Sequence, residues 1–222
     1  EPFCGSCAML LARPADHARP AETVNDADGM LVNVWRSLRD RPDETARLCA
    51  DPVMEIELHA RLAYVKERMT REFVAWLEGD PGHCDAKLAA YWIYATCASI
   101  GSCWNDDGPW RVVDGRLVNT RELPHIGDAG RGINRKLPHL CDAGVGEGRE
   151  ATIRQYFRAL ARRLENVRIC CGDWRRVVST PWVILAGQST AGIFLDPPYS
   201  VSPDLYVDGE DCSGEVREWC IG

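Results

Sequence analysis

Apolar residues recur at helical spacing along much of the chain. Leu31, Val34, Trp35 and Leu38 lie three or four positions apart, which predicts an amphipathic helix over Met30–Arg39. Similar patterns predict further helices at Ala8–Ala12, Asp43–Ala50, Met54–Leu77, Asp85–Ser99, Glu150–Glu165 and Glu215–Cys220. Most of the regular structure is therefore expected to be helical.

Three short apolar segments indicate strands, and an acid ends or closely follows each of them. The strands are Glu22–Asp26, Val167–Cys171 and Gly192–Asp196, and the acids are Asp26, Asp173 and Asp196. In open α/β folds, ligands bind beyond the carboxyl ends of the strands. We therefore expect an α/β fold in which the three acids share one rim with Glu1 and Gly5.

The first forty residues have the order turn, helix, strand, helix. The turn Glu1–Cys7 is rich in small residues, and Asp26 follows about 20 residues after it. In nucleotide-type cofactor sites an acid at this distance meets the ribose hydroxyls. A separate hairpin is expected at Trp110–Val113 and Arg116–Val118.

Composition limits the class of protein. The chain has 222 residues, 45% of them hydrophobic, so it can bury a sizeable core. Its longest apolar run, around residues 182–186, is too short to cross a bilayer. The sequence also starts without a secretory signal. We expect a cytoplasmic protein with no membrane partner.

The eleven cysteines are best explained as free thiols in a reducing compartment. One C-x-x-C pair, Cys4 and Cys7, stands alone without a second pair at metal-ligand spacing. His125 and His139 are more often solvated or core histidines than ligands. No metal is expected.

Charge is unevenly distributed. The formal net charge is −7, but residues 111–176 carry 14 Lys and Arg against 8 Asp and Glu. An acidic body with a basic middle fits a protein that touches a polyanion through one segment. Arg131, Arg135 and Lys136 lie in a Gly-rich stretch and are candidate phosphate contacts, although a solvent-exposed loop explains them equally well.

The tetrapeptide Asp196-Pro197-Pro198-Tyr199 is the most distinctive motif. Each proline has a fixed φ and no N–H, so the carbonyls before and between them are held in a stiff turn. The motif combines a carboxylate, carbonyl acceptors and a flat ring. This combination suits a flat base whose amino group must be held while its face is stacked. An ordinary proline turn after a buried strand is the alternative.

Four motifs together resemble the Dam-like N6-adenine DNA methyltransferases, in a phage-type branch. Glu1-Pro2-Phe3-Cys4-Gly5-Ser6-Cys7 resembles the cofactor loop EPF-x-G-x-G, and Asp26 resembles the acid that takes the cofactor's ribose. Asp173-Trp174 resembles the acid–aromatic pair near the cofactor adenine, and Asp196 to Tyr199 resembles the catalytic motif. The resemblance covers most of the chain.

The resemblance implies a fold and an activity. It implies a Rossmann-like sheet that binds S-adenosylmethionine, double-stranded DNA as substrate, and methyl transfer to the N6 amino group of adenine. The order of the motifs is that of the alpha group, which carries target recognition in an insert. Residues 1–40 and 150–222 would form the catalytic domain, and 41–149 a helical and Gly/Arg-rich recognition region.

Two departures leave alternatives open. Cys7 stands where the family pattern has a second glycine, so its side chain is expected to hinder cofactor binding if that position needs a positive φ. The family also has segments before the cofactor loop and after the catalytic turn, which suggests a chain truncated at both ends. The alternatives are a catalytically impaired DNA-binding remnant, and an amino-methyltransferase for cytosine N4, RNA or protein glutamine.

Overall fold

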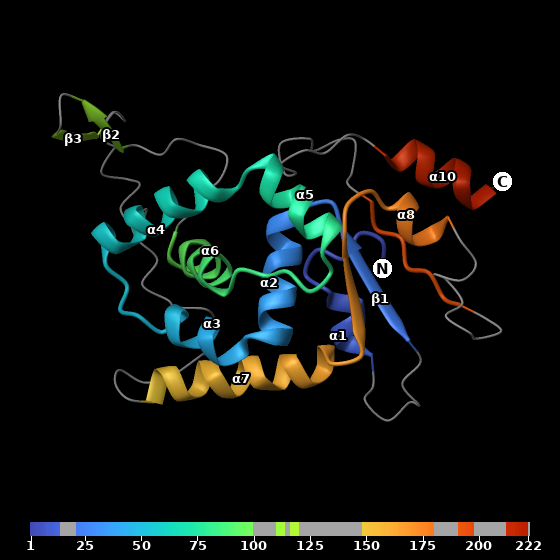
Figure 1. Cartoon of the computed structure of the whole chain (residues 1–222), viewed down its shortest axis with the longest axis horizontal. Coiled ribbons are helices and arrows are strands. Elements are labelled where there is room, and N and C mark those ends of the chain that lie inside the picture. The colour runs from blue at the N-terminus through green and yellow to red at the C-terminus, as the bar shows by residue number, and fades with distance from the viewer. Residues whose placement is uncertain are drawn as a thin grey trace, which may run out of the picture.

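A computed structural model describes residues 1–13, 21–99, 110–113, 116–119, 148–179, 191–197 and 212–221. Its helices within these ranges are α1 (Ala8–Ala12), α2 (Gly29–Asp40), α3 (Pro42–Cys49), α4 (Glu55–Arg68), α5 (Arg71–Gly79), α6 (Ala86–Ala98), α7 (Gly148–Leu164), α8 (Arg175–Val178) and α10 (Ser213–Ile221). Its strands are β1 (Glu22–Asp26), β2 (Trp110–Val113), β3 (Arg116–Asn119) and β4 (Val167–Cys171). In Figure 1, β1 and β4 lie side by side next to α8, and α7 runs below α2 and α3.

β1 and β4 form a parallel pair, whereas β2 and β3 form the expected antiparallel hairpin. The register pairs Glu22 with Val167 at one end and Asp26 with Cys171 at the other. Parallel pairing requires a long crossover, which here includes α2 to α7. The mixed α and β architecture agrees with the predicted α/β class, and the assignment as a Rossmann-like methyltransferase sheet stays a prediction.

The strand predicted at Gly192–Asp196 is wrong. Residues 191–197 adopt neither helix nor strand, and the side chains of Ile193 and Phe194 are 37% and 42% exposed. Only Leu195 packs into an apolar cluster, beside Trp174. A strand needs a hydrogen-bonding neighbour as well as an apolar sequence, and neither β1 nor β4 pairs with this segment.

The helix predicted over Met54–Leu77 is two helices, α4 and α5. The break lies at Met69 and Thr70, where the Thr70 hydroxyl accepts a hydrogen bond from the backbone N–H of Phe73 at 3.2 Å. This is an N-cap contact that starts a new helix. The other helices predicted from spacing are present, with ends shifted by at most two residues.

Helix α2 lies at the centre of the described structure. It contacts the strands β1 and β4 and the helices α3, α5, α6 and α7. The main core joins Val24 of β1, Ile169 of β4, Phe157 of α7 and Ala89 of α6. Helices from the predicted insert therefore share a core with the strands. The domain division at residues 41 and 149 itself stays a prediction.

Arg36 of α2 fixes the packing behind β4. Its Nε and Nη2 donate to the carbonyl of Ile169 at 3.1 and 3.0 Å, and Nη1 donates to the carbonyls of Leu77, Asp80 and His83 at 3.0, 2.9 and 3.3 Å. The side chain is 1% exposed, and this burial lowers the pKa of Arg36. The guanidinium thus ties β4 to the end of α5 and the loop before α6.

Candidate functional site

The turn at Gly5 is held between β1 and α2. The carboxylate of Asp26 accepts hydrogen bonds from the backbone N–H groups of Gly5 at 2.8 Å and Asp28 at 2.9 Å. On the other side of the turn, Trp35 Nε1 donates to the Gly5 carbonyl at 2.8 Å. Gly5 and Cys7 have φ angles of +43° and +53°. The turn is therefore fixed from two sides in a backbone conformation that favours glycine.

Asn25 connects this turn to the end of β4. Its buried Nδ2 donates to the carbonyls of Pro2 at 3.0 Å and Gly172 at 2.9 Å, and Gly172 N–H donates to the Asp26 carbonyl at 2.9 Å. Gly172 has φ +115°, and a Cβ there would lie 2.7 Å from Glu78 Oε1. The φ angle is what favours glycine at this position, since the close neighbour is the movable end of a long side chain.

A cavity of about 1030 Å³ opens beyond the ends of β1 and β4. Its wall contains eight of the residues predicted from the sequence to form the site, namely Glu1, Pro2, Phe3, Gly5, Asp26, Asp173, Trp174 and Asp196. These residues come from four separated parts of the chain. The structure thus brings the expected rim carboxylates and the small-residue turn around one cavity.

Acidic side chains dominate the cavity wall. The carboxylates belong to Glu1, Asp26, Asp28, Glu78, Asp173, Asp196 and Glu215, and the only described cationic side chains there are Arg71 and Arg175. Burial raises the pKa of the Glu1 carboxyl. A cavity with this balance favours a cationic ligand over an anionic one.

Arg175 links two of these carboxylates at the mouth. Its Nη1 donates to Asp173 Oδ2 at 2.9 Å, and its Nη2 pairs with Glu215 of α10. The backbone N–H of Arg175 also donates to Asp173 Oδ1 at 2.7 Å. All three side chains are about half exposed, so these contacts orient the groups more than they stabilise the fold.

Aromatic side chains form one apolar side of the cavity. The rings of Phe3 and Trp174 lie 5.9 Å apart, and Trp219 of α10 meets Trp174 edge to face at 6.0 Å. Val216 completes the contact between α10 and α8. Phe194 also lines the cavity and remains 42% exposed. The wall can therefore hold a flat ring next to carboxylates.

Cys7 lies apart from the cavity wall. It begins α1, its side chain is fully buried in the main core, and the described cavity residues do not include it. Its φ of +53° is a conformation that favours glycine, and its side chain lies in the core. A hydrogen bond with Cys7, together with burial, strongly raises the pKa of the Cys4 thiol. The Cys4 thiol is therefore protonated at neutral pH.

Several predicted site residues lie outside the described residues. They are Pro198 and Tyr199 of the proline motif and the three candidate phosphate contacts Arg131, Arg135 and Lys136. Of the motif, Asp196 is exposed on the cavity wall and Pro197 is half-buried.

Sequence patterns did not indicate the contribution of α5 to the cavity. Met69, Arg71, Phe73 and Glu78 all line it, although they belong to the predicted insert. Their proximity depends on the break at Thr70, which turns α5 towards the strand ends. The Thr70 cap, three residues before Phe73, was the local signal available for that break.

Among the residues that the structure describes, no group of three or more His, Cys, Asp and Glu side chains could hold a metal ion. No helix in the same part of the chain has the length and hydropathy needed to cross a bilayer. No family model and no curated protein sequence matches the chain.

Proposed function

We propose that the chain binds S-adenosylmethionine in the acidic cavity and transfers its methyl group to the N6 amino group of adenine in DNA. The observation that carries this proposal is the convergence of Gly5, Asp26, Asp173 and Asp196 on one cavity wall. Each belongs to a different motif of the resemblance to Dam-like methyltransferases. Spatial convergence is what a shared site requires and what motif order alone does not imply.

The cavity suits S-adenosylmethionine in charge and shape. This cofactor carries a sulfonium and an ammonium against one carboxylate, and the wall has many more carboxylates than cations. A Cβ at Gly5 would meet no atom within 4 Å, so the backbone at this turn is open to a ligand. Asp26 uses three of its roughly four acceptor positions on Gly5, Asp28 and the Cys4 thiol. One position remains for a ribose hydroxyl.

In this proposal, Asp196 and the Pro197 carbonyl hold the amino group of the target adenine. Hydrogen bonds from that group to both acceptors localise the nitrogen lone pair, which is otherwise delocalised into the ring. S-adenosylmethionine, when bound, supplies an electrophilic methyl group and the thioether leaving group. Asp196 can then accept the proton that the nitrogen loses. The contribution of the chain is positioning and electrostatics, with no covalent intermediate on the protein.

One observation favours a second function, that of a DNA-binding remnant without turnover. The segment that carries Asp196 is not paired with either strand of the parallel sheet, and Ile193 and Phe194 are exposed. A catalytic carboxylate needs a firm support to stay within about 0.5 Å of its productive position. Without that support, the cavity could bind ligands but transfer methyl groups poorly.

Two measurements separate these functions. The first is a calorimetric titration of the chain with S-adenosylmethionine, and the second is transfer of a labelled methyl group to unmethylated duplex DNA. Cofactor binding and methyl transfer together support the enzyme, whereas the absence of transfer from a chain that still binds the duplex supports the remnant. Transfer to cytosine N4, RNA or protein glutamine but not to duplex adenine would show a different amino-group substrate.

A further inference from the structure

Three exposed cations gather where α4 ends and α5 and α6 begin. Arg68 Cζ lies 3.7 Å from the ring centroid of Tyr64, and Lys87 Nζ lies 4.6 Å from the same centroid. Tyr91 supports Tyr64 edge to face at 5.2 Å. The third cation, Arg71, follows Arg68 by three residues across the helix break. We call Arg68, Arg71 and Lys87 the α4–α6 rim.

The carboxylates of the described residues leave this rim largely unneutralised. Arg68 pairs only with the neighbouring Glu67, whose side chain is 76% exposed. Within the described part of the chain, neither Arg71 nor Lys87 has a carboxylate within 4.0 Å. Tyr64 contacts both Arg68 and Lys87, and a bound anion would neutralise these two charges.

The rim is continuous with the acidic cavity. Arg71 lines the cavity, and so does Met69, which separates it from Arg68. Met69 and Tyr64 pack against the same apolar cluster, which includes Met30 of the cavity wall. A polyanion on the rim would therefore pass directly beside the cavity mouth.

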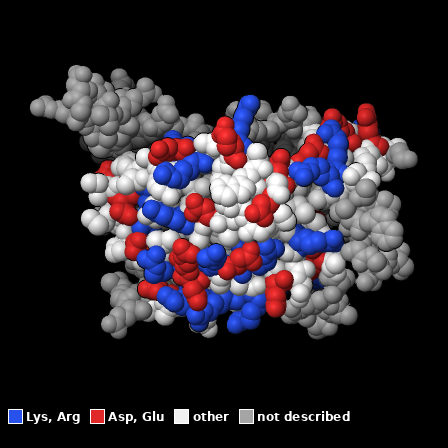
Figure 2. Space-filling model, in the orientation of Figure 1, with Lys and Arg blue, Asp and Glu red and all other residues white. Residues whose placement is uncertain are grey.

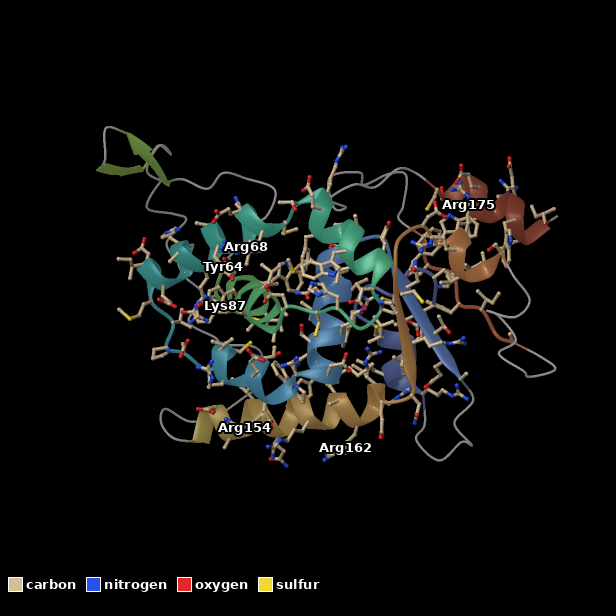
Figure 3. The ribbon with its side chains drawn as sticks, in the orientation of Figure 1. Tyr64, Arg68, Lys87, Arg154, Arg162 and Arg175 are labelled. Carbon is tan, nitrogen blue, oxygen red and sulfur yellow. The ribbon has the colours of Figure 1, made fainter. Side chains whose placement is uncertain are left out.

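The other large group of cations is less suited to this role. On α7, Arg154 pairs with Glu150, Arg158 with Asp43, and Arg163 with Glu22. Figure 2 shows positive and negative side chains interleaved over α3 and α7. No described α7 residue lines the cavity. In Figure 3, Arg154 and Arg162 lie along α7, away from Tyr64 and Arg68.

We propose that the α4–α6 rim contacts the phosphates of the DNA strand whose adenine enters the acidic cavity. This inference rests on the proposed function, since it takes the cavity as the site of the extruded base. Guanidinium and ammonium groups are the usual phosphate contacts, and such contacts position the duplex without reading its sequence. Tyr64 is a positioning residue because its ring contacts both Arg68 and Lys87.

The test measures the salt dependence of binding to an unmethylated duplex. The variant Arg68→Gln, Arg71→Gln, Lys87→Gln is compared with Arg154→Gln, Arg158→Gln, Arg162→Gln, which removes the same charge from α7. Each lost phosphate contact should make the slope of log K against log salt less steep by about 0.9. The slope of the rim variant should therefore be less steep than the wild-type slope by about 2.7. The α7 variant should keep the wild-type slope. The melting temperature should change little in both, and S-adenosylmethionine affinity should stay at the wild-type level in the α7 variant, which removes no residue of the cavity wall.

The outcomes distinguish the two proposals. An unchanged slope in the rim variant, or an equal loss in the α7 variant, overturns the rim and leaves the methyltransferase proposal standing. A wild-type chain that binds the duplex through the rim but does not bind S-adenosylmethionine overturns the methyltransferase proposal alone. A wild-type chain that binds no duplex even at low salt overturns the proposal that the rim contacts DNA.

Discussion

The two walls of the acidic cavity are built differently. The wall formed by the Gly5 turn and the strand ends is held by two buried hydrogen bonds that Asn25 donates, and by partly buried ones that Trp35 donates and Asp26 accepts. The wall that carries Asp196 is held by an aromatic cluster and by the exposed pairs of Arg175. Buried hydrogen bonds resist rearrangement because breaking them leaves desolvated groups unpaired, whereas exposed pairs exchange readily with water. The first wall is therefore preformed, and the second can adjust to a ligand.

The largest expected effect is a loss of stability when the preformed wall, at the Gly5 turn and the strand ends, is altered. Asn25→Ala leaves the carbonyls of Pro2 and Gly172 without their donor, which should lower the free energy of unfolding by about 3 kcal/mol. It should also weaken S-adenosylmethionine binding. Denaturant unfolding and calorimetry measure the two quantities.

Asn33→Ala is the matched control for that substitution. Asn33 is equally buried and exchanges two hydrogen bonds with the backbone of Asp85, which is not on the cavity wall, whereas the partners of Asn25, Pro2 and Gly172, are. It should be destabilising while cofactor affinity stays at the wild-type level. If both variants weaken cofactor binding equally, the Gly5 wall is not specifically preformed for the ligand.

The next largest effect is on turnover, at the wall that carries Asp196. Asp196→Asn should reduce methyl transfer by at least about 100-fold, because it removes the acceptor proposed for the amino group and its proton. Stability should change by less than about 0.5 kcal/mol, since Asp196 is exposed. Glu215→Gln removes the same charge from the same wall and should retain most of the turnover. Full activity of Asp196→Asn would refute the catalytic assignment of this carboxylate.

A smaller effect is the pH dependence of stability that we expect from Glu22, the first residue of β1. Burial alone would raise the pKa of Glu22, but the hydrogen bonds and charges of Arg163 and Arg13 outweigh it, and the net pKa is lowered. A lowered pKa means that this carboxylate stabilises the fold above its unfolded value of about 4.3, and that the stabilisation is lost as pH falls through the folded pKa.

Glu22→Gln should therefore lower the free energy of unfolding at pH 7 by about 1 kcal/mol. The difference from wild type should shrink as the pH is lowered below 4. Urea unfolding of both proteins across this range measures it. A difference that is constant with pH would mean that the ion pair with Arg163 is not its source.

The smallest expected effect is that of Cys7→Gly. Relief of the positive φ should gain about 1 kcal/mol, and loss of the buried side chain should cost about 1 kcal/mol. The net change in stability should be close to zero. Cofactor affinity should also stay unchanged, because Cys7 lies in the core and not on the cavity wall. A rise in affinity would show that position 7 reaches the ligand after all.

Local sequence patterns predicted the elements whose stability depends on their own residues. Helix α2 has its apolar residues at helical spacing and Asp28 as its N-cap, and it was predicted to within one residue at each end. β1 and β4 were placed in full, and the hairpin β2–β3 to within one residue. The grouping of Gly5, Asp26, Asp173 and Asp196 was also expected, because parallel strands bring their carboxyl ends to one edge.

The amino-acid sequence by itself determined most of the helices, the strands β1 and β4, and the residue types available to the site, because spacing, caps and motif residues are local properties. Only the tertiary structure decided that residues 191–197 would not pair as a strand, that α5 would supply part of the cavity wall, and that Cys7 would point into the core. These features depend on which segments become neighbours, and no residue's own preference specifies its neighbour. For the same reason the α4–α6 rim, with Lys87 some 20 residues from Tyr64, could not be identified before the helices were packed.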